Sequence, residues 1–138
     1  MKRIITIALL GTIFFSCEKS SNEIQNKGLI GKWQLTEYFM SPGDAGAWYP
    51  ADNSTLHTIE FKADGSFISS DAAYEGAIGY RQSGSAKINF ILPTQIPSET
   101  ECYFQLQDNN QTLILSPVGC IEGCSNKYKA ISGNAEKN

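Results

Sequence analysis

The sequence is short of the residues on which most enzymes and nucleic-acid-binding proteins depend. It has a single histidine, His57, only 18% charged residues and a formal net charge of -3. A domain without excess basic charge cannot neutralise a phosphate backbone, so we expect no nucleic-acid partner. Four cysteines among 138 residues are too few for a small scaffold held together by disulfides. A globular domain with its own hydrophobic core is therefore expected.

Catalytic motifs are also missing. General acid–base catalysis near neutral pH needs a group such as histidine or a tuned pair of carboxylates. His57 shares the parity of Ile59 and Phe61 in an alternating segment, and we interpret it as a hydrogen-bonded residue at the rim of a strand. No hydrolase, zinc-protease or phosphate-loop motif accompanies it. We therefore predict that the protein is not an enzyme and carries no cofactor and no metal.

No apolar run is long enough for a permanent transmembrane helix. Residues 4–15 carry no charge, but twelve residues fall short of the roughly 20 that a helix needs to cross a bilayer. Lys2 and Arg3 precede this run, and Ser16 and Cys17 follow it, which is the form of a secretory signal. The segment resembles the signal of bacterial lipoproteins, which is cleaved before a cysteine that then becomes lipidated.

This resemblance implies a lipoprotein signal peptide at 1–16, lipidation at Cys17, and a lipidated tether with a short turn at 17–28. Two or more acyl chains such as palmitate hold a protein durably at a membrane. The membrane is thus an expected partner, and the expected location is the bacterial cell envelope, at the outer membrane. The alternative is an ordinary secretory signal with a chance cysteine. Removal of 1–16 leaves nine of the eleven basic residues against fourteen acidic ones, a net charge of -5, so anionic headgroups would repel the domain.

The rest of the chain lacks helical periodicity and shows period-two alternation between turn signals. Eight strands are predicted, running through 31–39, 55–62, the segment from Phe67, 78–80, 88–92, 102–106, 113–115 and 127–131. Because closure removes unpaired edges, we predict an all-β fold, an eight-stranded antiparallel up-and-down barrel over 29–132, with a tail at 133–138. A two-sheet β-sandwich is the alternative.

One hairpin predicts its own register. A two-residue loop at Asp64-Gly65 would direct Phe67 to solvent, whereas a three-residue loop over 63–65 pairs Phe61 with Phe67. We predict the three-residue loop, with Gly65 in a left-handed conformation.

Three short segments together resemble a known family. They are Gly31-Lys-Trp33, Phe61-Lys-Ala-Asp-Gly-Ser-Phe67 and Cys120-Ile-Glu-Gly-Cys124, the last shortly before 127–129. Their order and spacing are similar to those of the lipocalin-like domain of small bacterial lipoproteins, over roughly 29–131. The resemblance implies that Trp33 closes one end of the barrel under a basic side chain, here Lys127 or Lys129. It also implies carriage of a small apolar ligand.

Two functions are compatible with this pattern. The first is binding of a small hydrophobic molecule by a monomer. Alternation places Trp33, Leu35 and Phe39 on one inward face. The candidate ligand residues are the inward-facing Trp33, Phe39, His57, Phe61, Phe67, Tyr80, Phe90 and Phe104, together with Trp48 and Tyr49. The second is a barrel filled by its own side chains, which acts as a protein interaction or inhibitor module. Trp48 and Tyr49 lie in the only long connection, 40–54, where they either plug one end of the barrel or form a lid over a ligand.

Three cysteines remain once Cys17 is lipidated. An oxidising compartment favours one disulfide, and the turn at 108–111 places Cys102 opposite Pro117. Cys120 and Cys124 are our preferred pair because they close their own five-residue loop. Pairing of Cys102 with either Cys124 or Cys120 stays open.

Overall fold

The computed structural model describes residues 27–41, 43, 45–121 and 123–132, and it confirms the all-β fold. The predicted signal peptide, Cys17 and the C-terminal tail lie outside the described residues. The elements are η1 (Lys27–Leu29), β1 (Gly31–Met40), β2 (Ala47–Pro50), β3 (Thr58–Phe61), β4 (Phe67–Ser69), η2 (Ala72–Tyr74), β5 (Gly79–Gln82), β6 (Lys87–Ile91), β7 (Glu99–Gln107), β8 (Thr112–Pro117) and β9 (Asn126–Ser132).

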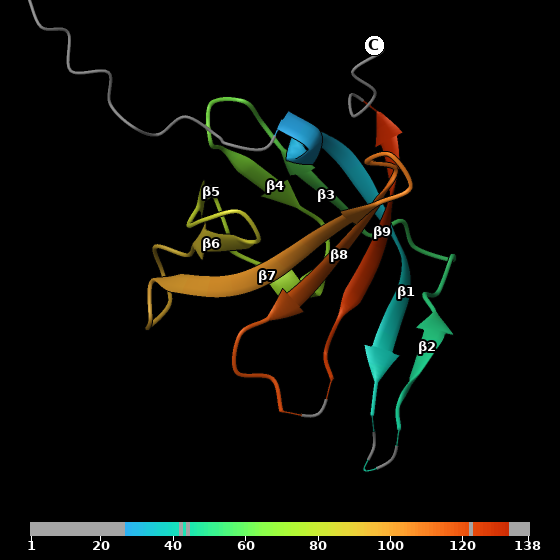
Figure 1. Cartoon of the computed structure of the whole chain (residues 1–138). Coiled ribbons are helices and arrows are strands. Elements are labelled where there is room, and N and C mark those ends of the chain that lie inside the picture. The colour runs from blue at the N-terminus through green and yellow to red at the C-terminus, as the bar shows by residue number, and fades with distance from the viewer. Residues whose placement is uncertain (1–26, 42, 44, 122, 133–138) are drawn as a thin grey trace, which may run out of the picture.

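Eight antiparallel strands form a nearly closed barrel in the order β4-β3-β1-β9-β8-β7-β6-β5 (Figure 1). The first and last strands meet, since Trp33 of β1 pairs with Ala130 of β9. At the remaining seam between β4 and β5, the Phe67 amide donates to the Ile78 carbonyl at 3.0 Å and the Tyr80 amide to the Gly65 carbonyl at 2.9 Å. The ladder of hydrogen bonds therefore runs almost completely around the molecule, which distinguishes a barrel from an open sandwich.

The predicted hairpin register is confirmed. Phe61 pairs with Phe67, and Gly65 has a φ of 85°, a conformation that glycine adopts at little cost. The turn is fixed by Asp64, whose carboxylate accepts hydrogen bonds from the amide and the hydroxyl of Ser66, at 2.9 and 2.6 Å. The two phenylalanines consequently face the barrel interior together.

The long connection between the first two predicted strands contains a ninth strand. β2 pairs with the second half of β1, with Tyr38 opposite Tyr49 and Phe39 opposite Trp48. The interpretation of 40–54 as one loop is thus wrong, and neither Trp48 nor Tyr49 plugs the barrel. Alternation over 47–50 is hidden in the sequence because the strand is only four residues long and ends at Pro50.

A β-bulge at Thr36 exchanges the two faces of β1. Leu35 pairs with Tyr128 and Glu37 with Lys127, so Thr36 is the extra residue on its strand. Its hydroxyl donates to the Lys127 carbonyl at 3.1 Å. The prediction that Phe39 shares the inward face of Trp33 and Leu35 is therefore wrong, because the bulge shifts the alternation by one residue.

The interior of the barrel is filled by large side chains. Buried members include Leu29, Trp33, Ile59, Phe61, Phe67, Tyr74, Tyr80, Ile88, Phe90, Leu92, Cys102, Phe104, Leu113, Leu115 and Tyr128. Tyr74 of η2 and Tyr128 of β9 were not predicted to face inward. Ile78 precedes β5 and is 60% exposed.

The two ends of the barrel differ. We call the end that carries η1 and the start of β1 the closed end; the indole Nε1 of Trp33 donates there to the Leu29 carbonyl at 3.0 Å. A Cβ on Gly28 would lie 2.9 Å from side-chain atoms of Leu106 and Asn110, so η1 packs tightly across this end. The open end, where β1 and β2 project beside the loop 118–125, lies on the opposite side of the barrel (Figure 1).

Candidate functional site

The predicted interior ligand residues pack mainly against one another. The Phe61 ring lies 5.0 Å from the ring of Phe67, 4.8 Å from that of Tyr80 and 6.0 Å from that of Phe90, measured between centroids. The Tyr80 hydroxyl donates to the Lys62 carbonyl at 2.8 Å. Burial raises the pKa of Tyr80 to about 12. These contacts make the aromatic interior a packed core, in which the rings occupy the space that a ligand would need.

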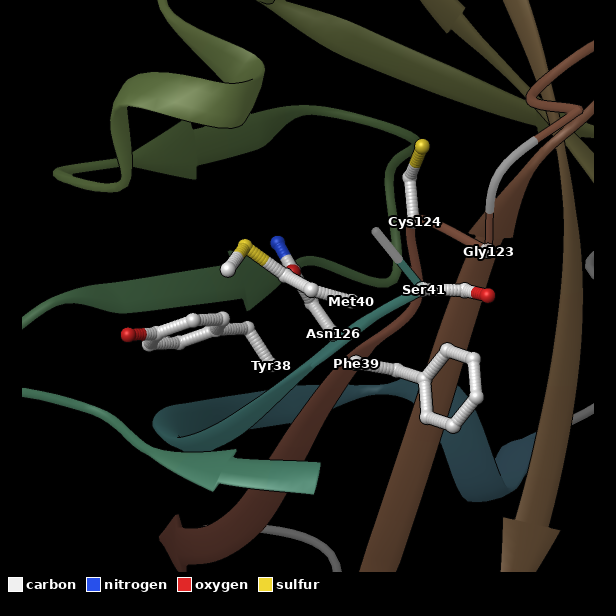
Figure 2. Close-up of a pocket in the computed structure, with 7 residues that line it drawn as sticks. All are labelled: Tyr38, Phe39, Met40, Ser41, Gly123, Cys124 and Asn126. Atoms are coloured by element: carbon white, nitrogen blue, oxygen red, sulfur yellow. The ribbon is translucent and has the colours of Figure 1, made fainter. Parts of the chain in front are cut away.

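The open end instead carries a groove. It has a volume of about 390 Å³ and is lined by Tyr38, Phe39, Met40, Ser41, Gly123, Cys124 and Asn126. Small-molecule sites usually occupy about 300–1,000 Å³, so the groove suits a small ligand. Figure 2 shows the side chains of Tyr38 and Met40 on one side of β1 and that of Phe39 on the other, as the alternation of a strand requires.

The wall of the groove combines apolar and aromatic side chains. Tyr38 is half-buried and stacks on Tyr49 of β2, with ring centroids 6.0 Å apart and an angle of 23° between planes. Met40 is 48% exposed at the edge of the groove. A thioether on a flexible side chain adapts to ligands of different shape. Apolar surface at this end is therefore available to a partner in a way that the interior is not.

The polar part of the groove continues into the barrel. Asn126 donates from Nδ2 to the Tyr128 hydroxyl at 3.2 Å, and that hydroxyl donates to Asp71 Oδ2 at 2.6 Å. Asp71 Oδ1 accepts from the Ala73 amide at 3.0 Å and so caps η2. This chain fixes the side chain of Asn126, which is half-buried and retains capacity for further hydrogen bonds through its amide.

A second buried tyrosine, Tyr74, and the thiol of Cys102 lie beside this chain. Burial is the main cause that raises the pKa of Tyr74 and of Tyr128 well above that of a free tyrosine. Burial likewise raises the pKa of Cys102, to about 11, and its thiol interacts with Tyr74. Cys102 therefore stays protonated near neutral pH and is poorly reactive.

A cluster on the outer face holds the groove wall in place. The Lys127 ammonium lies 4.0 Å from the centre of the Trp48 ring and pairs with Glu37. The expectation of a basic side chain over Trp33 is thus wrong for Lys127. The Lys129 ammonium does not cover Trp33 either. It forms an ion pair with Asp108, at 3.3 Å from Nζ to Oδ2, and donates a hydrogen bond to the Thr112 hydroxyl at 2.6 Å.

Phe39 packs between this outer cluster and the loop that joins β8 to β9. Its ring packs edge-on against Trp48, with centroids 5.4 Å apart. A Cβ on Gly46 would lie 2.5 Å from Phe39 Cζ, and one on Gly123 would lie 2.6 Å from Phe39 Cε1. Both glycines have positive φ, a backbone conformation that other residues adopt only with strain. The Phe39 ring therefore packs closely between two turns that require glycine.

The disulfide joins Cys120 to Cys124, the preferred one of the three pairings considered. Cys102 is buried and free, and it lies opposite Pro117 as predicted. Because the disulfide closes the loop between β8 and β9, it restrains Gly123 and Cys124 at the edge of the groove. Ile121, at the tip of this loop, is 97% exposed.

The remaining predicted site residues lie apart from the groove. His57 is half-buried just before β3, and its Nδ1 lies 3.4 Å from the Ser70 carbonyl oxygen, which places it at a strand rim. Phe104 is buried in the core. Residues missed from the sequence are Tyr38, Met40 and Asn126. The sequence feature that could have identified the first two is the run of three consecutive apolar residues, Tyr38-Phe-Met40. A strand with one face in solvent would alternate between apolar and polar residues instead.

No family model, no curated protein and no solved structure matches the chain. In the described part of the chain, no helix has the length and apolar character that a membrane crossing requires. Across the same residues, histidine, cysteine and carboxylate side chains form no group of three that would hold a metal ion.

Proposed function

We propose that this protein is a membrane-tethered, lipocalin-like lipoprotein of the bacterial cell envelope, and that it binds a small hydrophobic molecule in the open-end groove without acting as an enzyme. The observation that carries this proposal is the contrast between a groove of about 390 Å³ and an interior occupied by its own aromatic rings. The order of the three lipocalin-like segments and the lipoprotein-like signal before Cys17 support the tethered part of the proposal.

The groove favours an amphipathic ligand. Tyr38 and Met40 supply apolar surface, and burial of such surface contributes about 25 cal/mol per Å². Asn126 supplies an oriented amide for one polar group of the ligand, held by Tyr128 and Asp71. A molecule with an apolar body and one hydrogen-bonding group therefore fits this site best.

The proposal is tested with the fluorescent probe N-phenyl-1-naphthylamine and a soluble Cys17→Ser variant. Met40→Ser removes apolar surface from the groove, so we expect the probe to bind about tenfold more weakly, equivalent to about 1.4 kcal/mol. Ile68→Ser is the matched control, because Ile68 is 51% exposed on β4 and Met40 is 48% exposed. Equal affinity in both variants would remove the groove from the mechanism, and absence of probe binding would contradict carriage of a hydrophobic molecule.

One observation favours a second function, that of a protein interaction module. Tyr49, Met40 and Ile121 all expose apolar surface at the open end, and aromatic residues are frequent anchors at interfaces. In that case Tyr49→Ala would abolish capture of a partner from envelope extracts, whereas Tyr103→Ala, at a similarly exposed tyrosine of β7, would leave capture intact.

A further inference from the structure

The groove and the start of the described chain lie at opposite ends of the barrel. Lys27–Leu29 forms η1 at the closed end, whereas the groove begins at Tyr38. Nine peptide steps separate Gly31 from Met40 along β1. At about 3.3 Å per residue, the strand spans about 30 Å. The closed end, in blue, and the β1–β2 projection lie on opposite sides in Figure 1.

The tether reaches only a little further than this length. Ten peptide steps separate Cys17 from Lys27. Only full extension, to about 35 Å, would let the barrel turn over and bring the groove to the anchoring membrane. An anchor at Cys17 consequently holds the closed end near the bilayer and opposes inversion of the barrel, so the groove would reach the membrane only if the barrel lay on its side.

Electrostatic repulsion also opposes contact between the barrel and an anionic membrane surface. The net charge of -5 that remains without residues 1–16 is repelled by anionic headgroups. The outer wall carries solvated ion pairs, Arg81 with Glu99 and Lys87 with Glu101, across β5, β6 and β7. Hydrated pairs of this kind do not insert into a headgroup layer, so this wall offers no reason for the barrel to lie flat.

We infer that the groove faces the aqueous compartment, away from the anchoring membrane, and takes up a water-dispersed amphiphile rather than a lipid of the anchoring leaflet. This inference rests on the proposed function, in particular on the tether at Cys17. It adds the source of the ligand and the direction from which the ligand enters.

The two tryptophans report on the two ends of the molecule. Trp33 is fully buried at the closed end, whereas Trp48 is half-buried and packs against Phe39 beside the groove. The full-length lipidated protein is reconstituted into phosphatidylcholine–phosphatidylglycerol vesicles, with or without lipids that carry a nitroxide quencher on the headgroup. Trp48→Phe provides the baseline emission of Trp33. We expect nitroxide lipids to leave the Trp48 emission unchanged and aqueous iodide to quench it as strongly as in the soluble Cys17→Ser variant.

The possible outcomes separate the inference from the function on which it rests. Loss of most Trp48 emission with nitroxide lipids would place the groove at the bilayer and overturn the inference alone. Failure of the wild-type protein to float with vesicles would overturn the tether and the inference with it. A stable dimer of the soluble variant that vanishes with Met40→Ser would show a second copy on the groove and also overturn the inference. Continued flotation with iodide-accessible, nitroxide-insensitive Trp48 supports it.

Discussion

The barrel body and its open end use the same strand in opposite ways. In the first half of β1, Trp33 is buried in the core and Leu35 packs against it. After the bulge at Thr36, the inward face carries Tyr38 and Met40, which are half-buried and exposed, respectively. One inserted residue thus ends the packed interior and begins the groove. A filled barrel can therefore still carry an apolar groove where its strands extend beyond the core.

The largest effect should come from the centre of the body. Phe61→Ala removes a 1% exposed ring that contacts three other rings, so we expect the free energy of unfolding to fall by about 3–5 kcal/mol. Urea denaturation of the soluble variant measures this loss. Ile68→Ala on the outer face of β4 should change it by no more than about 0.5 kcal/mol. A small loss for Phe61→Ala would mean that the interior is loosely packed and open to a ligand.

Alkaline pH should weaken the body next. Burial raises the pKa values of Tyr74, Tyr80 and Tyr128, so the folded state holds these protons after the unfolded chain has released them. Their contribution to stability is complete below the unfolded pKa of about 10 and is lost as pH rises towards the folded pKa, about 12 for Tyr80. Each group lowers stability by up to about 1.4 kcal/mol per pH unit in this window.

Urea denaturation near pH 8 and near pH 11 checks this loss. The phenolate absorbance of the folded protein provides the control, since three of its six tyrosines should remain protonated at the higher pH. Titration of Tyr74, Tyr80 and Tyr128 near the ordinary tyrosine pKa, with the protein still folded, would contradict the buried placement of these rings.

The chain from Asn126 to Asp71 joins the two regions, so its disruption should affect both. Tyr128→Phe leaves Asp71 Oδ2 without its 2.6 Å donor and Asn126 without its acceptor. We expect unfolding to become easier by about 1–3 kcal/mol, together with weaker binding of the probe. Urea denaturation and the probe titration measure these two effects. Tyr103→Phe, at a 48% exposed tyrosine, is the control. Unchanged probe affinity would show that Asn126 is not positioned through Tyr128.

Much of the body could be predicted because alternation reports directly on a two-faced strand. Phe61, Phe67 and Phe90 were predicted inward and are buried there. The loop at 63–65 follows from the requirement that Phe67 share the face of Phe61, and the structure confirms this pairing. Local patterns and turn residues are sufficient wherever the strand keeps its register.

The open end could not be predicted because its geometry depends on one long-range event. The bulge at Thr36 is stabilised by the Lys127 carbonyl, 91 residues away in sequence, and by the Ala51 amide, which donates to the Thr36 carbonyl. Neither partner is visible to periodicity, so Phe39 was placed on the wrong face. The hydrogen-bonded chain of Asp71, Tyr128 and Asn126 was missed for the same reason, since it joins β9 to the start of η2, 57 residues away in sequence.

The smallest effect should come from the outer cluster that braces the groove. Lys127→Gln removes the cation over Trp48 and the pairing with Glu37, at a site where the lysine side chain is 21% exposed. A partly exposed cation–π contact and ion pair contribute about 0.5–1 kcal/mol, so the urea midpoint should move only slightly. Because β1 and β2 lose the contact that Lys127 makes with both strands, Trp48 should nevertheless become more accessible to the quencher acrylamide. Lys129→Gln, which breaks the pair with Asp108 at the closed end, should cause a similar small loss without exposing Trp48. Equal accessibility in the two variants would show that Phe39 alone, gripped by Gly46 and Gly123, is sufficient to hold the open end in place.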